Sequence, residues 1–365
     1  MRQTGAEASV LLRVRTAGPA SILLAVLLSF SGGTSAANNA VILLYHHVSD
    51  TTPASTSISP AVFEQHLKYL ADGYNVLPLE QIMSQLTAGK TLPERTVAIT
   101  FDDGYRNIYA NAHPLLSSYG MPYTVFINPP LIGKQGNQLS WKQVAEMESG
   151  GARFANHTMH HDHLLERARD ENEADWRGRI RQDILAAEEI LQEKLGYSLR
   201  YIAYPYGEFD AALRALVSDI GFVGFGQHSG AIFSGSDFRA LPRFAAAGSY
   251  ANLDSLKVKI NSLALPVTDV GGMSDSDGKG GEVTAGFTFT FDSEDLAVKQ
   301  IACYFKGRTL PVSVVHSTVE VKLPGPLPTG RSRVNCTGPS TAQVGRYYWY
   351  AHPWFIARPD GTYPD

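Results

Sequence analysis

Short, nearly continuous apolar segments alternate with amphipathic segments from Val41 to about Leu265. A strand that is apolar along its whole length is buried on both faces, which is typical of a parallel sheet covered by helices on both sides. We therefore expect strands at 41–45, 96–101, 123–127, 152–155, 200–204 and 222–225. This succession of strand–helix units favours an α/β barrel, and an open doubly wound sheet is the alternative.

The segments between these strands carry helix signals at their ends. Ser59 is suited to cap a helix over 60–70, because its hydroxyl accepts a backbone N–H and Pro60 fits the first turn. Further helices are expected over 107–119 and 175–195, each followed by a glycine that permits a left-handed end.

The residue pattern changes after Pro266. A stretch rich in Gly, Ser and Asp, 266–282, is typical of a linker or a long loop. Beyond it apolar and polar residues alternate with period two, as at 287–291, and no helix of useful length is expected. We therefore expect a barrel domain at 38–265 and a small all-β, sandwich-like accessory domain at 283–365.

The N-terminal segment has the pattern of a secretory signal peptide, expected at 1–37. Arginines precede an apolar run at 22–30 that is too short to span a bilayer comfortably, and small residues follow it. The mature chain is thus expected to be exported, to the periplasm or out of the cell, with no transmembrane span. Cys303 and Cys336 both lie in the expected sandwich and should form a disulfide in such an oxidising compartment.

Charge and composition exclude several classes of protein. The 365 residues carry 31 basic and 35 acidic side chains, a net charge of −4. This balance lacks the excess of basic residues expected of a protein that binds nucleic acid or an anionic membrane. Two cysteines are too few for a disulfide-rich scaffold or an all-cysteine zinc site. The function must therefore be sought in individual motifs.

Two adjacent carboxylates, Asp102 and Asp103, follow the strand expected at 96–101. Like charges in one cavity raise each other's pKa, so two carboxylates in one site need a reason. A metal ion supplies it, if one Asp binds the ion and the other remains a base beside it. An ordinary surface turn ending in Asp103-Gly104 is the alternative.

Four histidines lie within the seven residues 157–163, again after an expected strand. His157 and His161 are four residues apart, so one helical turn or a tight loop can aim both at one ion. Two imidazoles and one carboxylate are a common catalytic metal set that leaves a position open for water. A solvent-exposed loop is the alternative, and His160 and His163 are expected to have structural or supporting roles.

The third motif, Tyr204-Pro205-Tyr206-Gly207, ends the strand expected at 200–204. Pro205 fixes the chain and Gly207 permits a sharp bend. Such a turn can aim a backbone N–H into a site as an oxyanion donor. An ordinary turn is the alternative.

Taken together, 100–104, His157-Thr158-x-x-His161 and 204–207 resemble the motifs of the polysaccharide deacetylases, carbohydrate esterase family 4. The resemblance extends from about Val41 to Phe244. It implies a distorted (β/α)7 barrel and an enzyme that removes N-acetyl groups from a glycan.

The resemblance also implies a role for each matching residue. Asp102 would be the catalytic base, and Asp103, His157 and His161 would bind a divalent ion, zinc first and cobalt or nickel as alternatives. The N–H of Tyr206 would help to hold the oxyanion.

The sequence departs from the family pattern at two positions. Asp162 follows His161 where the family usually has Pro, and Ala203 stands where it usually has Arg. In the family that arginine tethers the base, so Arg239 or Arg243 is expected to orient the base here.

No late strand ends in a histidine that matches the family's general acid. Instead His46 and His47 follow the first expected strand, 41–45. This arrangement is similar to a circularly permuted subgroup that acts on poly-β-1,6-N-acetylglucosamine of biofilms, in which the early strand supplies the general acid. Position favours His46 for that role, with His47 as the alternative, and a purely structural histidine pair is a third interpretation.

The resemblance therefore implies a metal-dependent hydrolase that releases acetate from an N-acetylglucosamine-containing polysaccharide. An O-acetyl glycan esterase is the alternative, because the chemistry is the same with an easier leaving group. A non-catalytic exported glycan-binding protein is a third hypothesis, although it would not need Asp102, Asp103, His157 and His161 together. The accessory domain is expected to bind glycan or a protein partner.

Overall fold

The computed structural model describes residues 36–134, 136–271 and 286–364. Most of the predicted signal peptide, 1–37, lies outside the described residues. Its last two residues, Ala36–Ala37, form strand β1, which pairs with β6 (Leu92–Pro93). In the described part of the chain, no helix combines the length and the apolar character needed to cross a bilayer.

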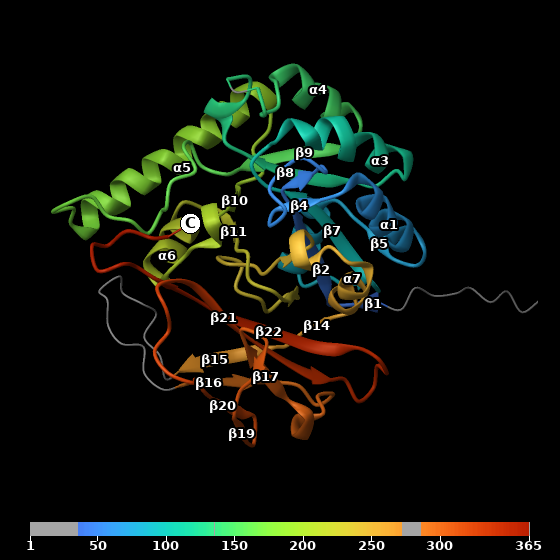
Figure 1. Cartoon of the computed structure of the whole chain (residues 1–365), viewed down its shortest axis with the longest axis vertical. Helices are drawn as coiled ribbons and strands as arrows, with labels where there is room; N and C mark the ends of the chain where they lie inside the picture. The colour runs from blue at the N-terminus through green and yellow to red at the C-terminus, as the bar shows by residue number, and fades with distance from the viewer. Residues whose placement is uncertain (1–35, 135, 272–285, 365) are drawn as a thin grey trace, which may run out of the picture. The chain divides into compact units, whose positions relative to one another are not determined.

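A parallel sheet forms the centre of the first region, in the spatial order β11-β10-β9-β8-β7-β2 (Figure 1). All six residues of β2 and all six of β7 are buried, as the continuous apolar runs predict. These strands are β2 (Ala40–Tyr45), β7 (Thr96–Phe101), β8 (Tyr123–Ile127), β9 (Ala152–Asn156), β10 (Tyr201–Ala203) and β11 (Val223–Phe225).

The two edges of this sheet are joined by a segment with weak strand character. Leu241 makes a parallel bridge to Phe225 of β11, and β13 (Phe244–Ala245) runs parallel to β2. β12 (Ala231–Ile232) pairs antiparallel with β2. The sheet therefore curls into the distorted α/β barrel that the sequence predicts. Short strands β3 (His47–Val48), β4 (Ser57–Ile58) and β5 (Asn75–Val76) lie beside it.

Helices cover the outside of the barrel sheet (Figure 1). Ser59 caps α1 as expected, because its hydroxyl accepts the N–H of Val62. The predicted helix over 107–119 is divided into a π-helical turn and α3, and Gly196 ends α5 at φ 79°. The α-helices are α1 (Pro60–Ala71), α2 (Leu79–Thr87), α3 (His113–Ser118), α4 (Trp141–Ser149), α5 (Glu173–Leu195), α6 (Ala211–Asp219) and α7 (Leu253–Ile260). The short turns are η1 (Ile108–Ala112), η2 (Pro129–Leu131), η3 (Pro205–Gly207), η4 (Gly248–Tyr250) and η5 (Val298–Gln300).

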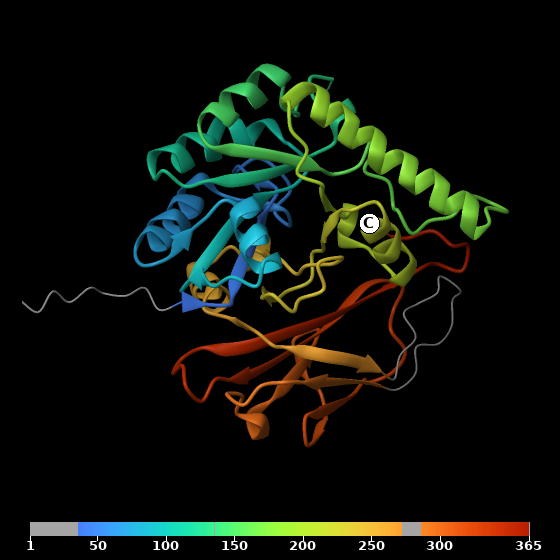
Figure 2. The ribbon, with the colours of Figure 1, turned by 180° about the vertical axis from the view of Figure 1, so that it is seen from behind.

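The C-terminal region is a two-sheet structure, drawn in orange and red in Figure 2. One sheet has the order β14-β22-β21-β17-β18 and the other β15-β16-β20-β19. Alternate residues such as Phe287, Phe289, Val319 and Val321 fill the core between the sheets. The strands are β14 (Leu263–Ala264), β15 (Val267–Gly271), β16 (Gly286–Phe291), β17 (Ala302–Phe305), β18 (Arg308–Thr309), β19 (Val312–Val315), β20 (Thr318–Lys322), β21 (Gly330–Pro339) and β22 (Tyr347–Ile356).

The start of the predicted linker, 266–282, differs from the expectation. Val267–Gly271 form β15, which pairs antiparallel with β16. The remainder of that linker, 272–282, lies outside the described residues. The barrel and the two sheets fall within one compact unit, Ser35–Asp365.

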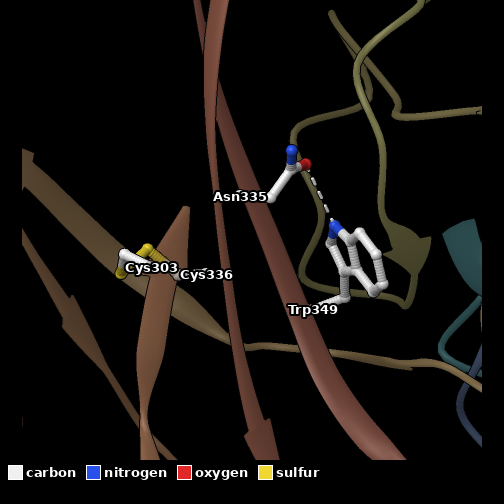
Figure 3. Close-up of a disulfide and its surroundings, with 4 residues drawn as sticks. All are labelled: Cys303, Asn335, Cys336 and Trp349. Atoms are coloured by element: carbon white, nitrogen blue, oxygen red, sulfur yellow. Dashed lines mark hydrogen bonds between the residues drawn. A yellow bond between two sulfur atoms is a disulfide. The ribbon is translucent and has the colours of Figure 1, made fainter. Parts of the chain in front are cut away.

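The predicted disulfide is present (Figure 3). Cys303 of β17 and Cys336 of β21 are directly opposite each other, with their Cα atoms 4.0 Å apart. Both residues are buried in the core between the sheets. On the same sheet, Trp349 Nε1 donates to Asn335 Oδ1 over 3.3 Å, and the indole packs edge-on against Phe244 of the barrel.

Candidate active site

Every motif residue follows a strand of the barrel sheet at its carboxyl end. His46 follows β2, Asp102 and Asp103 follow β7, and Tyr206 follows β10. His157 directly follows β9, and His161 lies four residues beyond it. Because the strands are parallel, their carboxyl ends meet at one edge of the sheet, where barrel proteins place their sites.

Three of the predicted residues converge on one point. Asp103 Oδ1 lies 3.2 Å from His157 Nε2 and 3.4 Å from His161 Nε2. The three candidate ligand atoms lie within 4.8 Å of one another. His157 is buried, whereas Asp103 and His161 are half-buried. The structure thus brings together the three predicted ligands.

The donor atoms of this cluster suit a divalent cation. Asp103 Oδ1 and His157 Nε2 are both buried, and neither has a hydrogen-bond partner among the described residues. The other ring nitrogen of His157, Nδ1, contacts the carbonyl of Ala203 at 2.8 Å, which leaves Nε2 directed at Asp103. A hydrogen bond to the ring nitrogen that does not face the metal fixes the orientation of histidine rings at metal sites. Two imidazoles and one carboxylate fit zinc and neighbouring transition metals.

The backbone around the cluster is held in strained conformations. Asp103, Thr158 and His161 have φ angles of 71°, 70° and 59°, the left-handed region that costs energy for residues with a Cβ. Gly104 must be glycine, because a Cβ there would lie 2.8 Å from Ile127 Cγ2. These features explain why the two carboxylates are followed by glycine.

Asp103 and Asp102 are kept ionised in different ways. Burial raises the pKa of Asp103, but its contacts with His157 and His161 and the charges of His46 and His157 outweigh burial and hold that pKa well below its ordinary value. For Asp102 burial also opposes ionisation, and the guanidinium of Arg243 more than offsets it, so the pKa is lowered. Two adjacent carboxylates therefore remain charged with separate partners.

The partner of Asp102 is a fully buried arginine. Arg243 Nη1 and Nη2 donate to Asp102 Oδ1 and Oδ2, each over 2.7 Å. Arg243 Nε also donates to the carbonyl of Gly226. Of the two arginines that the sequence leaves open, Arg239 instead pairs with Asp237 at 2.7 Å and lies partly in solvent.

The two early histidines have different surroundings. His46 is in the electrostatic field of Asp103 and Asp102; burial lowers its pKa, and these carboxylates oppose that effect. His47 is stacked on Tyr105 at 3.8 Å between ring centroids and lies within 2.8 Å of Asn107 Nδ2. Burial lowers the pKa of His47 as well, against the field of Asp103. The packing contacts of His47 leave His46 as the preferred candidate for the site.

The third motif forms the tight turn that the sequence suggests. Tyr206 has φ 56° and ψ 1°, and its ring lies edge-on to His161 with centroids 4.7 Å apart. Gly207 is also left-handed, and a Cβ there would lie 2.6 Å from Gln227 Cβ. The Tyr206 turn is thus adjacent to a candidate metal ligand.

Two supporting residues, Asn128 and Glu208, were not identified from the sequence. Asn128 follows β8 and donates to the carbonyls of His157 and Thr158, which holds the histidine loop. Glu208 is buried and within 2.8 Å of His163 Nδ1, and the His163 ring stacks on Tyr206 at 3.9 Å. The signal for Asn128 is a polar residue directly after an apolar strand, whereas Glu208 gives no signal without the fold. His163 was expected to have a structural or supporting role, and its contact with Glu208 agrees with that expectation.

The fold and the site define a parallel barrel protein with a candidate divalent-metal centre beside a buried Asp–Arg pair. Residues 89–225 match the polysaccharide deacetylase family. This segment is therefore similar to a polysaccharide deacetylase domain. It includes Asp102, Asp103, His157, His161 and Tyr206, whereas His46 and Arg243 lie outside the matched segment.

Parts of the chain are also similar to individual known proteins. YxkH of Bacillus subtilis (strain 168) is 40% identical over 100 residues, 27% of this chain and 36% of that protein. The poly-beta-1,6-N-acetyl-D-glucosamine N-deacetylase of Escherichia coli (strain K12) is 26% identical over 223 residues, 52% of this chain and 33% of that protein. The chain thus spans about a third of the length of these two relatives.

A solved structure shows the same fold. The Streptococcus pyogenes deacetylase PplD, determined in complex with acetate, aligns with a TM-score of 0.55 at 22% identity. The alignment covers 61% of this chain and 98% of that chain. This similarity supports the barrel architecture.

Proposed function

We propose that this protein is a metal-dependent hydrolase that removes N-acetyl groups from an N-acetylglucosamine-containing polysaccharide and releases acetate. The observation that carries the proposal is the convergence of Asp103, His157 and His161 within 4.8 Å, next to the separately paired Asp102. The family match and the similarity to the Escherichia coli N-deacetylase support the substrate class.

Asp103, His157 and His161 would hold the cation, with zinc favoured and cobalt or nickel as alternatives. When bound, such an ion polarises an acyl carbonyl and makes water more acidic. The three side chains leave the solvent-facing side of the site for substrate, because Asp103 and His161 are only half-buried.

Asp102 is suited to act as the base. Its two oxygens accept one hydrogen bond each from Arg243, and a carboxylate oxygen has a second lone pair to accept a proton from water. Arg243 orients the carboxylate, and its charge keeps Asp102 deprotonated before the reaction. This division leaves Asp103 as ligand and Asp102 as base.

His46 and the Tyr206 turn would provide proton delivery and charge stabilisation. His46 would donate a proton to the departing amine, which would otherwise be a poor leaving group. The peptide N–H of Tyr206 would stabilise the negative charge on the former carbonyl oxygen. The products are acetate and a free glucosamine unit.

Acetate release from a panel of glycans tests the proposal. The mature protein, loaded with zinc, cobalt or nickel, is incubated with N-acetylglucosamine oligomers and with O-acetylated xylan oligomers. N-deacetylation predicts acetate from the former. Release only from O-acetylated xylan would identify an esterase instead, and binding without any release would identify a non-catalytic glycan-binding protein.

We also propose the domain organisation and location that the sequence predicts. A signal peptide at 1–37 precedes a barrel at 38–265 and, after the linker 266–282, an accessory sandwich at 283–365. The disulfide between Cys303 and Cys336 supports export to an oxidising compartment, either the periplasm or the exterior. Mass spectrometry of the mature protein from fractionated cells tests both the cleavage site and the location.

A further inference from the structure

The C-terminal sheets contact the Tyr206 turn directly. Arg331, on β21, donates from Nη1 to the carbonyl oxygen of Tyr206 over 2.6 Å. The same nitrogen lies 3.4 Å from Gln227 Oε1, and a Cβ at Gly207 would meet that glutamine. The Arg331 guanidinium therefore contacts both the Tyr206 turn and the neighbouring Gln227.

Arg331 is itself placed by a buried contact between the two regions. On β22 its cross-strand neighbour is Phe355, which is 6% exposed. Phe355 packs against Phe209 at 5.3 Å between ring centroids, and Phe209 lies three residues after Tyr206. The sheets are thus attached to the barrel immediately beside the turn.

The turn needs such support because its conformation is intrinsically unfavourable. Tyr206 has a Cβ and adopts φ 56°, a region that is costly for residues other than glycine. A hydrogen bond to its carbonyl opposes rotation of the following peptide, and a charged donor makes a stronger bond than a neutral one. Contacts of the Tyr206 ring with His161 and His163 constrain the other side of the residue.

We propose that Arg331 is a positioning residue for the deacetylase site, so that the C-terminal sheets complete the barrel's catalytic turn. Arg331 acts by fixing the 206–207 peptide, so that Tyr206 keeps the left-handed backbone conformation on which the direction of its own N–H, in the preceding peptide, depends. The expected change in kcat rests on the proposed function. The expected effect of Arg331 on the structure of the turn does not. It gives the accessory region a role in catalysis in addition to any binding of glycan.

The test compares Arg331→Met with Arg333→Met in the full mature chain. Arg333 is two residues along the same strand and also reaches the barrel, where Nη2 donates to Tyr250 OH over 3.2 Å. It therefore matches Arg331 in strand, side chain and type of contact but does not contact the turn. Both proteins are loaded with zinc, and kcat and KM are measured for acetate release from N-acetylglucosamine oligomers.

We expect Arg331→Met to lower kcat by about tenfold to 100-fold with little change in KM, since misplacement of an oxyanion donor affects the transition state. Arg331→Lys, which retains a charged donor, should recover part of the loss, and Arg333→Met should keep the wild-type kcat. An unchanged kcat in Arg331→Met, or an equal loss in Arg333→Met, would overturn the proposal.

Hydrogen–deuterium exchange provides a readout that does not depend on activity. Arg331→Met should speed amide exchange in the 204–209 segment, whereas Arg333→Met should not. If the zinc-loaded wild-type protein released no acetate, the proposed function would be wrong, but this exchange difference would still support the positioning contact. Identical exchange in the two variants would overturn it.

Discussion

Asp102 and Arg243 are both fully buried, so each charge depends on the other. Water cannot solvate either group if its partner is removed, and a broken buried pair typically costs about 3–5 kcal/mol. The pair therefore links stability to catalysis, because the same arginine orients the proposed base. Arg239 forms a partly exposed pair and provides a natural control.

We expect Arg243→Met to lower the free energy of unfolding by about 3–5 kcal/mol, and Arg239→Met by at most about 1 kcal/mol. Urea unfolding monitored by fluorescence measures both values. Arg243→Met should also lose acetate release even under conditions where it is folded. Equal stabilities for the two variants would show that Asp102 does not depend on Arg243.

A buried histidine distant from the metal cluster makes stability depend on pH. His66 is fully buried between Tyr45 OH, at 3.0 Å, and the Ala251 carbonyl, at 2.6 Å. Burial lowers its pKa from 6.5 to about 4, although the hydrogen bond to Ala251 opposes this effect. Between these two values the unfolded chain binds a proton that the folded chain does not.

The neutral His66 therefore makes its full contribution to the free energy of unfolding above pH 6.5, and this contribution is lost as the pH falls toward 4. We expect the wild-type protein to lose about 2 kcal/mol more than His66→Gln between pH 7 and pH 5. Urea unfolding of both proteins at both pH values measures this difference. The other titrating groups are the same in the two proteins, so their effects cancel. The same pH dependence in both proteins would contradict a neutral buried His66.

At the scale of secondary structure, local signals predicted most of the barrel. The six predicted apolar segments correspond to β2, β7, β8, β9, β10 and β11, because a strand that is buried on both faces has a continuous apolar sequence. The strands that join the sheet edges were not predicted, because β12 and β13 have two residues each and no periodicity can be recognised in two residues. β15 was assigned to the linker because it adjoins the stretch rich in Gly, Ser and Asp, which begins at Gly271.

The disulfide is the strongest single constraint within the two-sheet region. It joins β17 to β21 across a sequence separation of 33 residues. We expect the Cys303→Ala/Cys336→Ala double variant to lose about 2–4 kcal/mol of stability, mainly because its unfolded chain is less restricted. Urea unfolding of the double variant and of the reduced wild-type protein measures this loss. No loss in either sample would show that the two sheets do not require the cross-link.

At the scale of the whole molecule, the motifs predicted which residues meet in the candidate site but not how distant segments complete it. Asp103, His157 and His161 were expected to meet because parallel strands end at one edge. The choice between Arg239 and Arg243 depended on a contact across 141 residues of sequence, which no local pattern encodes. Arg331 was not predicted either, since its partner Tyr206 is 125 residues away.

The most direct test of the account is a zinc titration of chelator-treated mature protein, with acetate release from an N-acetylglucosamine oligomer followed at each step. The account predicts no release without metal and a linear rise that saturates at about one zinc ion per chain. Asp103→Ala and His161→Ala should bind zinc weakly and remain inactive at that ratio. Full acetate release in the presence of chelator, or wild-type zinc binding and activity in both variants, would contradict the account.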